Sequence, residues 1–554
     1  GLSGLRQGFS TPVAVLMGMV GLVLLIACAN VASLLVARAT ARQMVIGVRL
    51  ALGACRGRIV RQALFESLLL SLAGGAVGLV LSVWVGELLV GLLPSSGSTT
   101  RLLSATPDLR VGLFTLAVSL VTAAVFGLAP ALQTSRPDMN RTLREEAGSL
   151  SGGQAHARLR KGLVVAQVAL SMLLVAGAGL FARSLYNLKH LNPGFDATSL
   201  VSFAISPELS GYSQARIKQF YAALQQDLQA VTGVAGVSMA AEPVLTDSIS
   251  SRTIQVQGYE TKPDENMNPW TNEVGPDYFR TMGQTLLLGR EFTPRDAEGA
   301  PLVAVVNETF ARYYFGSENP IGRRFGWRVL NDPGAIEIVG VVKDSLHGTM
   351  REGTTEDNQI RRFAYTPLQQ STELGGMTVY VRSTPEGRAG LVERLREAVH
   401  RRDASMPLYD VATMEQTIDE AVFTERMLAV LSAAFGLLAT LLAAVGLYGL
   451  MSYTVARRTR EIGIRIALGA ERRTVVWLVL REVAVLTGIG VLIGIPAALA
   501  LSRVVSSQLF GLSPTDPLTL VAAATTLTLV GALAGYLPAR RAAAVEPVRA
   551  LRYE

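Results

Sequence analysis

Seven long stretches of this 554-residue chain contain no Asp, Glu, Lys or Arg. A helix needs about 20 apolar residues to cross the hydrocarbon core of a bilayer, and each stretch reaches that length. Charged residues make up only 17% of the chain, against about 25% in soluble domains. We therefore predict seven transmembrane helices, within residues 7–37, 67–86, 111–135, 162–182, 427–456, 483–502 and 517–539.

Arginine residues are concentrated in alternate connections between these predicted spans. Four basic segments follow the first, third, fifth and seventh span, whereas the loops 88–110 and 503–516 carry few charges. Basic loops stay on the cytoplasmic side of a membrane, so the N-terminus and the insert 184–424 are expected outside. The net charge of +8 is assigned to these loops, so we predict membrane lipid and no nucleic acid as a partner.

The insert 184–424 has the pattern of a folded α+β domain. Strand-like runs, alternating or rich in β-branched residues, occupy 253–257, 302–306, 336–342 and 377–381. Apolar residues at helical spacing predict two helices, one through Ile217, Phe220, Leu224 and Leu228, the other through Leu391, Leu395 and Val399. The fold class is thus a membrane α-helical protein with a large α+β periplasmic domain.

An internal repeat organises the predicted spans. Residues 46–54 read IGVRLALGA and residues 462–470 read IGIRIALGA. Span, basic loop, span, short loop, span and basic tail occur twice in the same orientation, so the copies are parallel and not inverted. The domains are a first repeat, a cytoplasmic linker, a transmembrane helix, the insert and a second repeat, at residues 1–145, 146–161, 162–182, 184–424 and 425–554.

The repeated segment predicts a short amphipathic helix beside the membrane. Ile462, Arg465, Ile466 and Gly469 follow helical spacing, and Gly469 can end the helix in a left-handed conformation. Such a cytoplasmic helix can dock into a groove on a partner, or it can lie on anionic lipid. Its repetition in equivalent loops favours docking.

A pair of glycines also recurs, and its two copies are separated by the same number of positions as the two segments above. Gly74 and Gly78 in the first repeat correspond to Gly490 and Gly494 in the second. Small residues four positions apart allow close approach of helices in lipid, so all four are predicted helix-packing positions.

No catalytic motif accompanies these features. The 554 residues contain no G-x-x-x-x-G-K-[ST] phosphate-binding loop and no H-E-x-x-H or G-x-S-x-G sequence. Residues 150–154, LSGGQ, spell the signature peptide of ABC ATPases, but they lie in a short linker without a phosphate-binding loop upstream. We predict that the chain is not an enzyme and binds no cofactor or metal.

The repeated spans with REIGIRIALGA at 460–470 resemble the FtsX-like permease domain of the MacB, LolC/LolE and FtsX superfamily. The insert resembles the MacB-type periplasmic core domain, notably in GPDYFRTMG at 275–283 and NPIGR at 319–323. In duplicated permeases of this kind each unit has a span, a periplasmic domain and three more spans. The first unit here has only its last three spans, so we expect the sequence to be truncated at its N-terminus.

The resemblance implies that a separate ABC ATPase binds ATP and docks on the cytoplasmic coupling helices. The coupling positions carry over to Arg460, Glu461, Ile462, Arg465 and Gly469. In the first copy they are Met44, Val45, Ile46, Arg49 and Gly53, so the Arg-Glu pair is absent there. Weaker docking, or docking mainly through Arg49 and apolar contact, is expected for this copy.

The resemblance leaves several functions open. The preferred one is the permease subunit of an ABC-type transporter in the bacterial inner membrane, exporting a hydrophobic drug, peptide or lipoprotein. A non-transport mechanotransmitter that regulates cell-wall hydrolases, and a sensor that partners a kinase, are the alternatives. A periplasmic adaptor or substrate is a further possible partner. A membrane-anchored enzyme is disfavoured because residues 184–424 hold no catalytic constellation.

Overall fold

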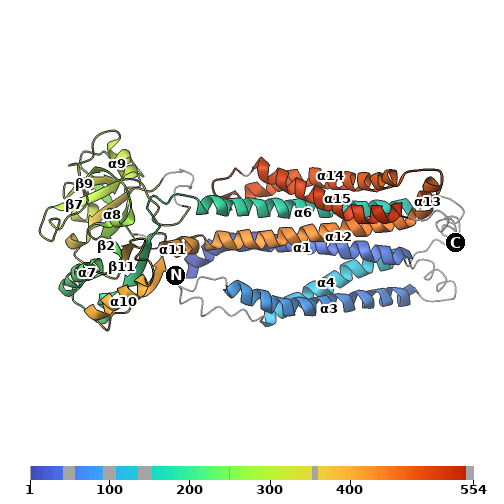
Figure 1. Cartoon of the computed structure of the whole chain (residues 1–554), viewed down its shortest axis with the longest axis horizontal. Coiled ribbons are helices and arrows are strands. Elements are labelled where there is room, and N and C mark those ends of the chain that lie inside the picture. The colour runs from blue at the N-terminus through green and yellow to red at the C-terminus, as the bar shows by residue number, and fades with distance from the viewer. Residues whose placement is uncertain are drawn as a thin grey trace. The chain divides into compact units, whose positions relative to one another are not determined.

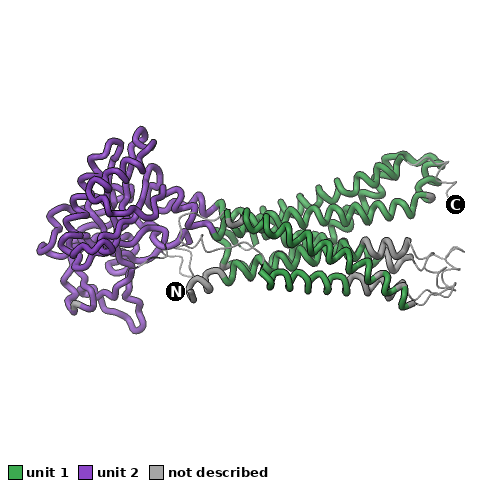
Figure 2. The backbone as a smooth tube through the Cα atoms, turned by 90° about the horizontal axis from the view of Figure 1, so that it is seen from below, with its two compact units in different colours: residues 1–93, 102–186, 424–554 green, residues 94–101, 187–423 purple. Residues whose placement is uncertain are grey.

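The computed structural model describes residues 2–41, 56–91, 108–134, 153–246, 248, 250–351, 360–513 and 515–544. The chain forms two compact units, coloured separately in Figure 2. The helical unit contains residues 1–93, 102–186 and 424–554, and the sheet unit contains residues 94–101 and 187–423. The first lies largely within the predicted membrane repeats and the second within the predicted insert.

The helical unit consists of long helices with one short helix between two of them (Figure 1). Among the described residues, six helices are long and apolar enough to cross a membrane. The remaining predicted span, residues 111–135, also forms a helix, α4, and its side chains are described as far as Ala124. The helices are α1 (Leu2–Ala41), α3 (Arg56–Gly91), α4 (Leu109–Thr134), α6 (Gly153–Lys189), α12 (Phe423–Arg457), α13 (Thr459–Ala467), α14 (Arg472–Val504) and α15 (Pro517–Ala543).

Helix α6 is the central element of the helical unit. Half of its most apolar stretch is buried, a larger share than in any other described span. Val168 packs in a cluster with residues of α12, α14 and α15, and Leu174 packs in another with residues of α1 and α12. Because α6 continues to Lys189, it is also the covalent entry into the sheet unit.

Polar side chains of α1 and α6 bond the backbone of α12 inside the helical unit. The Asn30 side chain of α1 donates a hydrogen bond of 2.9 Å to the Leu442 carbonyl of α12. Ser171 of α6 donates to the Ala439 carbonyl of α12 over 3.2 Å. Hydrogen bonds from Ser and Asn side chains across helices help helices associate in lipid, so these contacts hold α12 against α1 and α6.

The sheet unit is built on one mixed twelve-stranded sheet. Its main path runs β12-β1-β11-β2-β5-β10-β7-β9-β8-β4, with β3 paired to β5 and β6 to β9. The pairs β5–β10 and β7–β9 are parallel and the others are antiparallel. The strands are β1 (Leu200–Ile205), β2 (Val234–Ala240), β3 (Ser250–Ser251), β4 (Ile254–Val256), β5 (Trp270–Val274), β6 (Leu286–Gly289), β7 (Leu302–Asn307), β8 (Arg324–Trp327), β9 (Ile336–Val342), β10 (Phe363–Pro367), β11 (Met377–Ser383) and β12 (Tyr409–Thr413).

Two hydrophobic cores divide the sheet unit into lobes. Helices α7 (Gln214–Gln229) and α10 (Leu391–Arg402) cover β1, β2 and β11. Helix α9 (Glu308–Phe315) packs with β4, β7, β8 and β9. The remaining short helices are α8 (Tyr278–Met282) and α11 (Met414–Ala421).

The helices and strands predicted in the insert are confirmed. The apolar residues that predicted the two helices are all buried, on α7 and α10. The four predicted strands coincide with β4, β7, β9 and β11. Sheet order follows from pairings between distant residues, and the sequence pattern contained no information on it.

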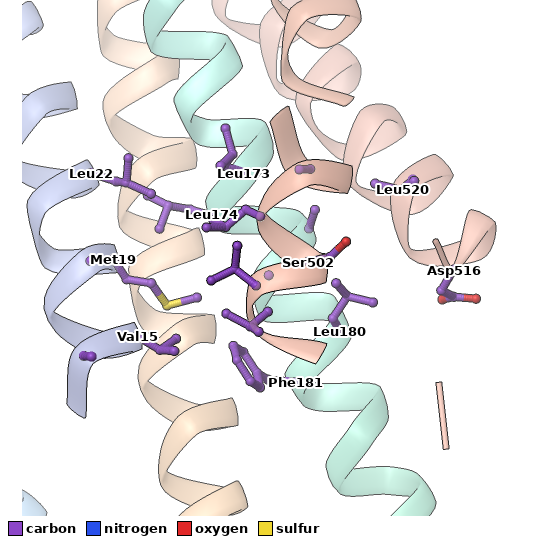
Figure 3. Close-up of a pocket in the computed structure, with 18 of the residues that line it drawn as sticks. Val15, Met19, Leu22, Leu173, Leu174, Leu180, Phe181, Ser502, Asp516 and Leu520 are labelled. Atoms are coloured by element: carbon purple, nitrogen blue, oxygen red, sulfur yellow. The ribbon is translucent and has the colours of Figure 1, made fainter. Parts of the chain in front are cut away.

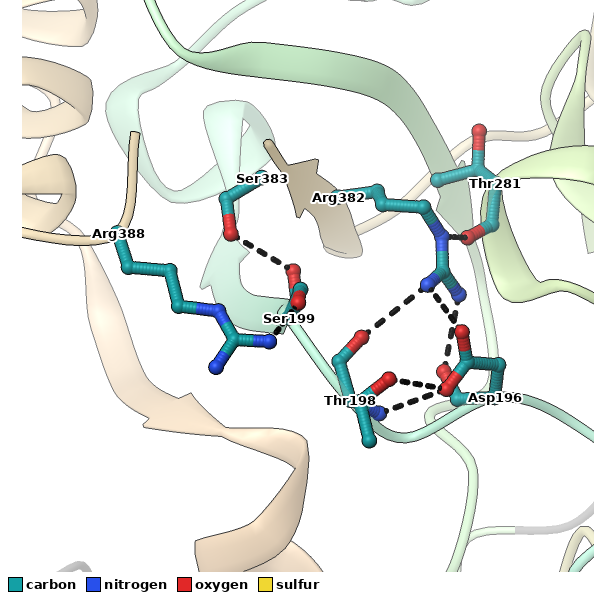
Figure 4. A network of polar contacts seen from close by, with 7 residues as sticks. All are labelled: Asp196, Thr198, Ser199, Thr281, Arg382, Ser383 and Arg388. Atoms are coloured by element: carbon teal, nitrogen blue, oxygen red, sulfur yellow. Dashed lines mark hydrogen bonds and ion pairs between the residues drawn. The ribbon is translucent and has the colours of Figure 1, made fainter. Parts of the chain in front are cut away.

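The segment that follows α6 is held against β11 by an arginine (Figure 4). The Arg382 guanidinium bonds the Asp196 carboxylate at 2.8 Å and the carbonyls of Thr198 and Thr281 at 3.1 and 2.7 Å. Partial burial alone would raise the pKa of Asp196, but hydrogen bonds from Thr198 and the charge of Arg382 outweigh it and lower that pKa. The entry into the sheet unit is therefore fixed by a charged pair.

Acidic pH is expected to destabilise the sheet unit through His347. This side chain is buried, its ring lies 4.1 Å from that of Phe363, and burial lowers its pKa to about 3. The unfolded chain takes up a proton near pH 6.5, so stability falls as pH drops from 6.5 toward 3. Between pH 7.5 and pH 5 the free energy of unfolding falls by about 2 kcal/mol through this group.

Denaturant unfolding at the two pH values, followed by tryptophan fluorescence, measures this loss. His347→Gln should flatten the pH dependence by about that amount, whereas His400→Gln, at an exposed position on α10, should leave it unchanged. An identical pH slope in wild type and His347→Gln would contradict the assignment.

Candidate functional site

The short helix α13 lies between the long helices α12 and α14. Its Ile462 side chain is only 3% exposed and packs in a cluster with Val475 of α14 and with Ala542 and Ala543 of α15. A buried Ile is worth about 1.5–3 kcal/mol relative to an exposed one. Ile462 therefore anchors α13 to the bundle.

Gly469 ends α13 in a Schellman motif. Its φ is +95°, the left-handed region that a residue with a Cβ adopts only with strain. The Ala470 N–H donates to the Arg465 carbonyl at 2.9 Å, and the Gly469 N–H donates to the Ile466 carbonyl at 3.0 Å. The left-handed conformation predicted at this glycine is thus observed.

The opposite face of α13 is exposed and carries both charge and apolar surface. It consists of Glu461, Ile464, Arg465 and Leu468, which we call the α13 outer face. Glu461 and Arg465 form an ion pair of 2.6 Å, each side chain about half exposed. Ile464 and Leu468 are 43% and 83% exposed. A helix face of this kind suits docking into a groove of mixed character.

The predicted coupling residues fall into three groups. Glu461 and Arg465 lie on the α13 outer face, while Ile462 points into the bundle. Arg460 lies within α13, but its side chain is outside what the structure describes. The first-copy positions Met44, Val45, Ile46, Arg49 and Gly53 all lie outside the described residues.

Sequence reasoning missed Ile464 and Leu468. Together with Glu461 and Arg465 they follow the spacing i, i+3, i+4, i+7, which marks one helix face. That periodicity was present in the sequence, but it does not tell which of two apolar stripes faces the bundle.

An ion cluster connects this site to α6. Glu482 of α14 lies 2.5 Å from the Lys161 ammonium of α6 and 3.6 Å from the Arg458 guanidinium at the joint between α12 and α13. The Glu482 side chain is only 19% exposed, so the attraction is screened less than at an open surface. Next to Lys161, Arg160 lies over the Tyr453 ring of α12 at 4.1 Å. The joint, α14 and α6 thus meet at one carboxylate.

The predicted packing glycines differ between the repeats. A Cβ at Gly490 would lie 2.7 Å from Val168 of α6, and one at Gly494 would lie 2.6 Å from Met172 of α6. At Gly74 and Gly78 no heavy atom lies within 4 Å of such a Cβ. Among the described residues the close approach occurs in the second repeat, against α6, and a packing role for the first pair stays a prediction.

Two known protein families match this chain. Residues 17–139 and 433–547 match the FtsX-like permease C-terminal family, and residues 162–398 match the MacB-like periplasmic core domain. The chain is a multi-pass membrane permease with a periplasmic domain. It combines an FtsX-like permease domain, matched in two parts, with a MacB-like periplasmic core domain, as the resemblance predicted.

Similar proteins include the macrolide export ATP-binding/permease protein MacB of Bdellovibrio bacteriovorus, 26% identical over 54% of this chain and 46% of that protein. The pyoverdine export ATP-binding/permease protein PvdT of Pseudomonas aeruginosa is 30% identical over 50% of this chain and 41% of that protein. The chain spans less than half the length of these relatives.

Solved structures similar to the chain include the periplasmic region of MacB from Actinobacillus actinomycetemcomitans, with a TM-score of 0.28 and 16% identity. The match covers 42% of this chain and 94% of the MacB periplasmic region. The extracellular domain of the noncanonic ABC-type transporter YknZ has a TM-score of 0.26 and 15% identity. That match covers 38% of this chain and 98% of the YknZ domain.

Proposed function

We propose that this chain is the membrane subunit of an exporter in the bacterial inner membrane and that a separate ABC ATPase drives it. The ATPase docks on the α13 outer face, closes on ATP, and changes the conformation of the periplasmic domain. The observation that carries this proposal is the combination of an exposed docking face with an anchored helix: Leu468 and Arg465 point outward while Ile462 holds α13 to the bundle.

The ion cluster supports a route for this motion. A displacement of α13 acts on Arg458, whose partner Glu482 also binds Lys161 at the cytoplasmic start of α6. Helix α6 continues to Lys189, so its movement reaches the periplasmic domain through the covalent chain. The Arg382–Asp196 pair then fixes the segment after α6 to β11.

The cargo is proposed from the names of relatives. Relatives carry macrolide export and pyoverdine export in their names. We infer that this chain contributes to export or efflux of an amphiphilic compound.

Co-purification tests the proposal. Protein isolated from native membranes in mild detergent should carry a bound ATPase, detected by mass spectrometry and by ATP hydrolysis. Leu468→Asp should release it, because a carboxylate replaces an exposed apolar contact. Intact protein without any bound ATPase, in wild type and variant alike, would refute the proposal.

Cysteine labelling tests the proposed orientation. In a Cys55→Ser background, Val329→Cys should react with a membrane-impermeant maleimide in intact spheroplasts, because Val329 is 90% exposed in the periplasmic domain. Arg473→Cys, exposed at the start of α14, should react only after permeabilisation. The native Cys28 is buried and should stay unlabelled. The reverse labelling pattern would overturn the orientation.

A further inference from the structure

The helical unit contains a cavity of about 460 Å³ (Figure 3). It is partly open, and it is lined by α1 of the first repeat, by α6, and by the end of α14 and the start of α15 of the second repeat. Its walls are almost entirely hydrocarbon, with Val15 and Met19 on one side, Leu174 and Phe181 on another and Leu520 on a third. This volume is in the range of about 300–1,000 Å³ typical of small-molecule sites.

One end of the cavity is polar. Asp516, the N-cap of α15, lines it and forms an ion pair of 2.6 Å with Arg183 of α6. The Arg183 side chain is 40% exposed. Leu22 of α1 and Leu173 of α6 lie among the apolar residues farther along their helices from this pair. The cavity is therefore amphipathic along its length.

The place of the cavity along the spans fits entry from the outer leaflet. On α6, residues 173–181 come shortly before the periplasmic domain, which begins at Asn187. Residues of α14 from Ala498 onward line it next to the loop 503–516, which the arginine distribution places outside. An apolar void of this size loses dispersion contacts along its walls unless a hydrocarbon ligand fills it.

We propose that this cavity binds one hydrocarbon chain of a lipid-like amphiphile, with the polar head at the Arg183–Asp516 pair. The chain runs from Asp516 toward Leu22 and Leu173 and contacts both repeats at once. This site goes beyond the ATPase docking proposed above, and none of the measurements that test it involves ATP.

Two glycines of α1 provide a matched pair of variants. Gly18 lines the cavity, Gly21 does not, and a Cβ at either position meets no heavy atom within 4 Å. Gly18→Phe therefore fills the cavity without a backbone clash, whereas Gly21→Phe adds the same ring to the same helix outside it. Both variants should fold like the wild type.

The probe is a palmitoyl lysophosphatidylcholine with a photoreactive diazirine in its chain, added in trace amount to phospholipid vesicles containing the full chain. A label near the methyl end should crosslink around Leu22 and Leu173, and a label near the head around Asp516. Gly18→Phe should lower this crosslinking by about tenfold or more, a loss of about 1.4 kcal/mol or more in binding, and Gly21→Phe should not.

Equal crosslinking in all three proteins would overturn the proposal. So would crosslinks confined to lipid-facing residues such as Leu529 and Leu533 of α15, which are 60% and 68% exposed. Native mass spectrometry distinguishes the two sources of the amphiphile. A phospholipid retained through purification by wild type and Gly21→Phe, but not by Gly18→Phe, identifies a bilayer lipid; a cavity filled only by added lysolipid identifies an amphiphile supplied from outside the bilayer.

Discussion

Arg465→Glu should reduce ATP hydrolysis coupled to this permease by about tenfold or more while the protein stays folded. Arg465 is half exposed on α13, and its ion pair with Glu461 is an exposed helical pair. Such pairs contribute only about 0.3–0.5 kcal/mol, so losing one does not unfold the helix. Reversing a charge inside a docked interface costs several kcal/mol, because like charges then face each other.

The double variant Glu461→Arg with Arg465→Glu separates docking from helix stability. It restores an ion pair on α13 with its direction reversed. If the native pair only stiffens the helix, the double variant recovers coupling; if the face is read by a partner, coupling stays lost. We expect it to stay lost. ATPase activity of the purified complex measures coupling, and normal coupling in Arg465→Glu alone would contradict the docking assignment.

Gly490→Leu should destabilise the helical unit by about 1–3 kcal/mol, the range for overpacking a well-packed contact. A Cβ at this position would lie 2.7 Å from the Val168 side chain and 3.1 Å from the Val165 carbonyl of α6. The backbone of α6 would therefore have to move away from α14. Because α6 also binds Glu482 through Lys161, we expect the ion cluster to loosen as well.

The internal repeat supplies the control for this variant. Gly74→Leu makes the same chemical change at the matched position of α3, where no heavy atom lies within 4 Å of the added Cβ. We expect no loss of stability there. Thermal unfolding in detergent, followed by far-UV circular dichroism, compares the two. Equal melting temperatures for both variants would show that α6 does not pack against Gly490 as described.

The sequence predicted the local elements well because their signals are local. A charge-free run of about 20 residues identifies a span from its own composition. The end of α13 at Gly469 could be predicted because the left-handed conformation is a property of glycine itself. The buried faces of α7 and α10 followed from helical periodicity.

Burial could not be predicted from the sequence where contact with a neighbouring helix decides it. Ile462 and Ile464 are equally apolar, and only the packing of α14 and α15 against α13 buries the first and exposes the second. Gly490 and Gly74 are equivalent in sequence, yet among the described residues a Cβ at Gly490 would meet a neighbouring helix within 4 Å and one at Gly74 would not.

The membrane class, the parallel repeat and the inserted domain could be predicted from hydropathy, charge and repeated motifs along the chain. The binding of Glu482 to both Lys161 and Arg458, the central place of α6 and the hydrocarbon-lined cavity became visible only in the folded protein. Glu482 and Lys161 are hundreds of positions apart along the chain. Such pairs are set by which faces fit together when the helices pack, and no local pattern records that fit.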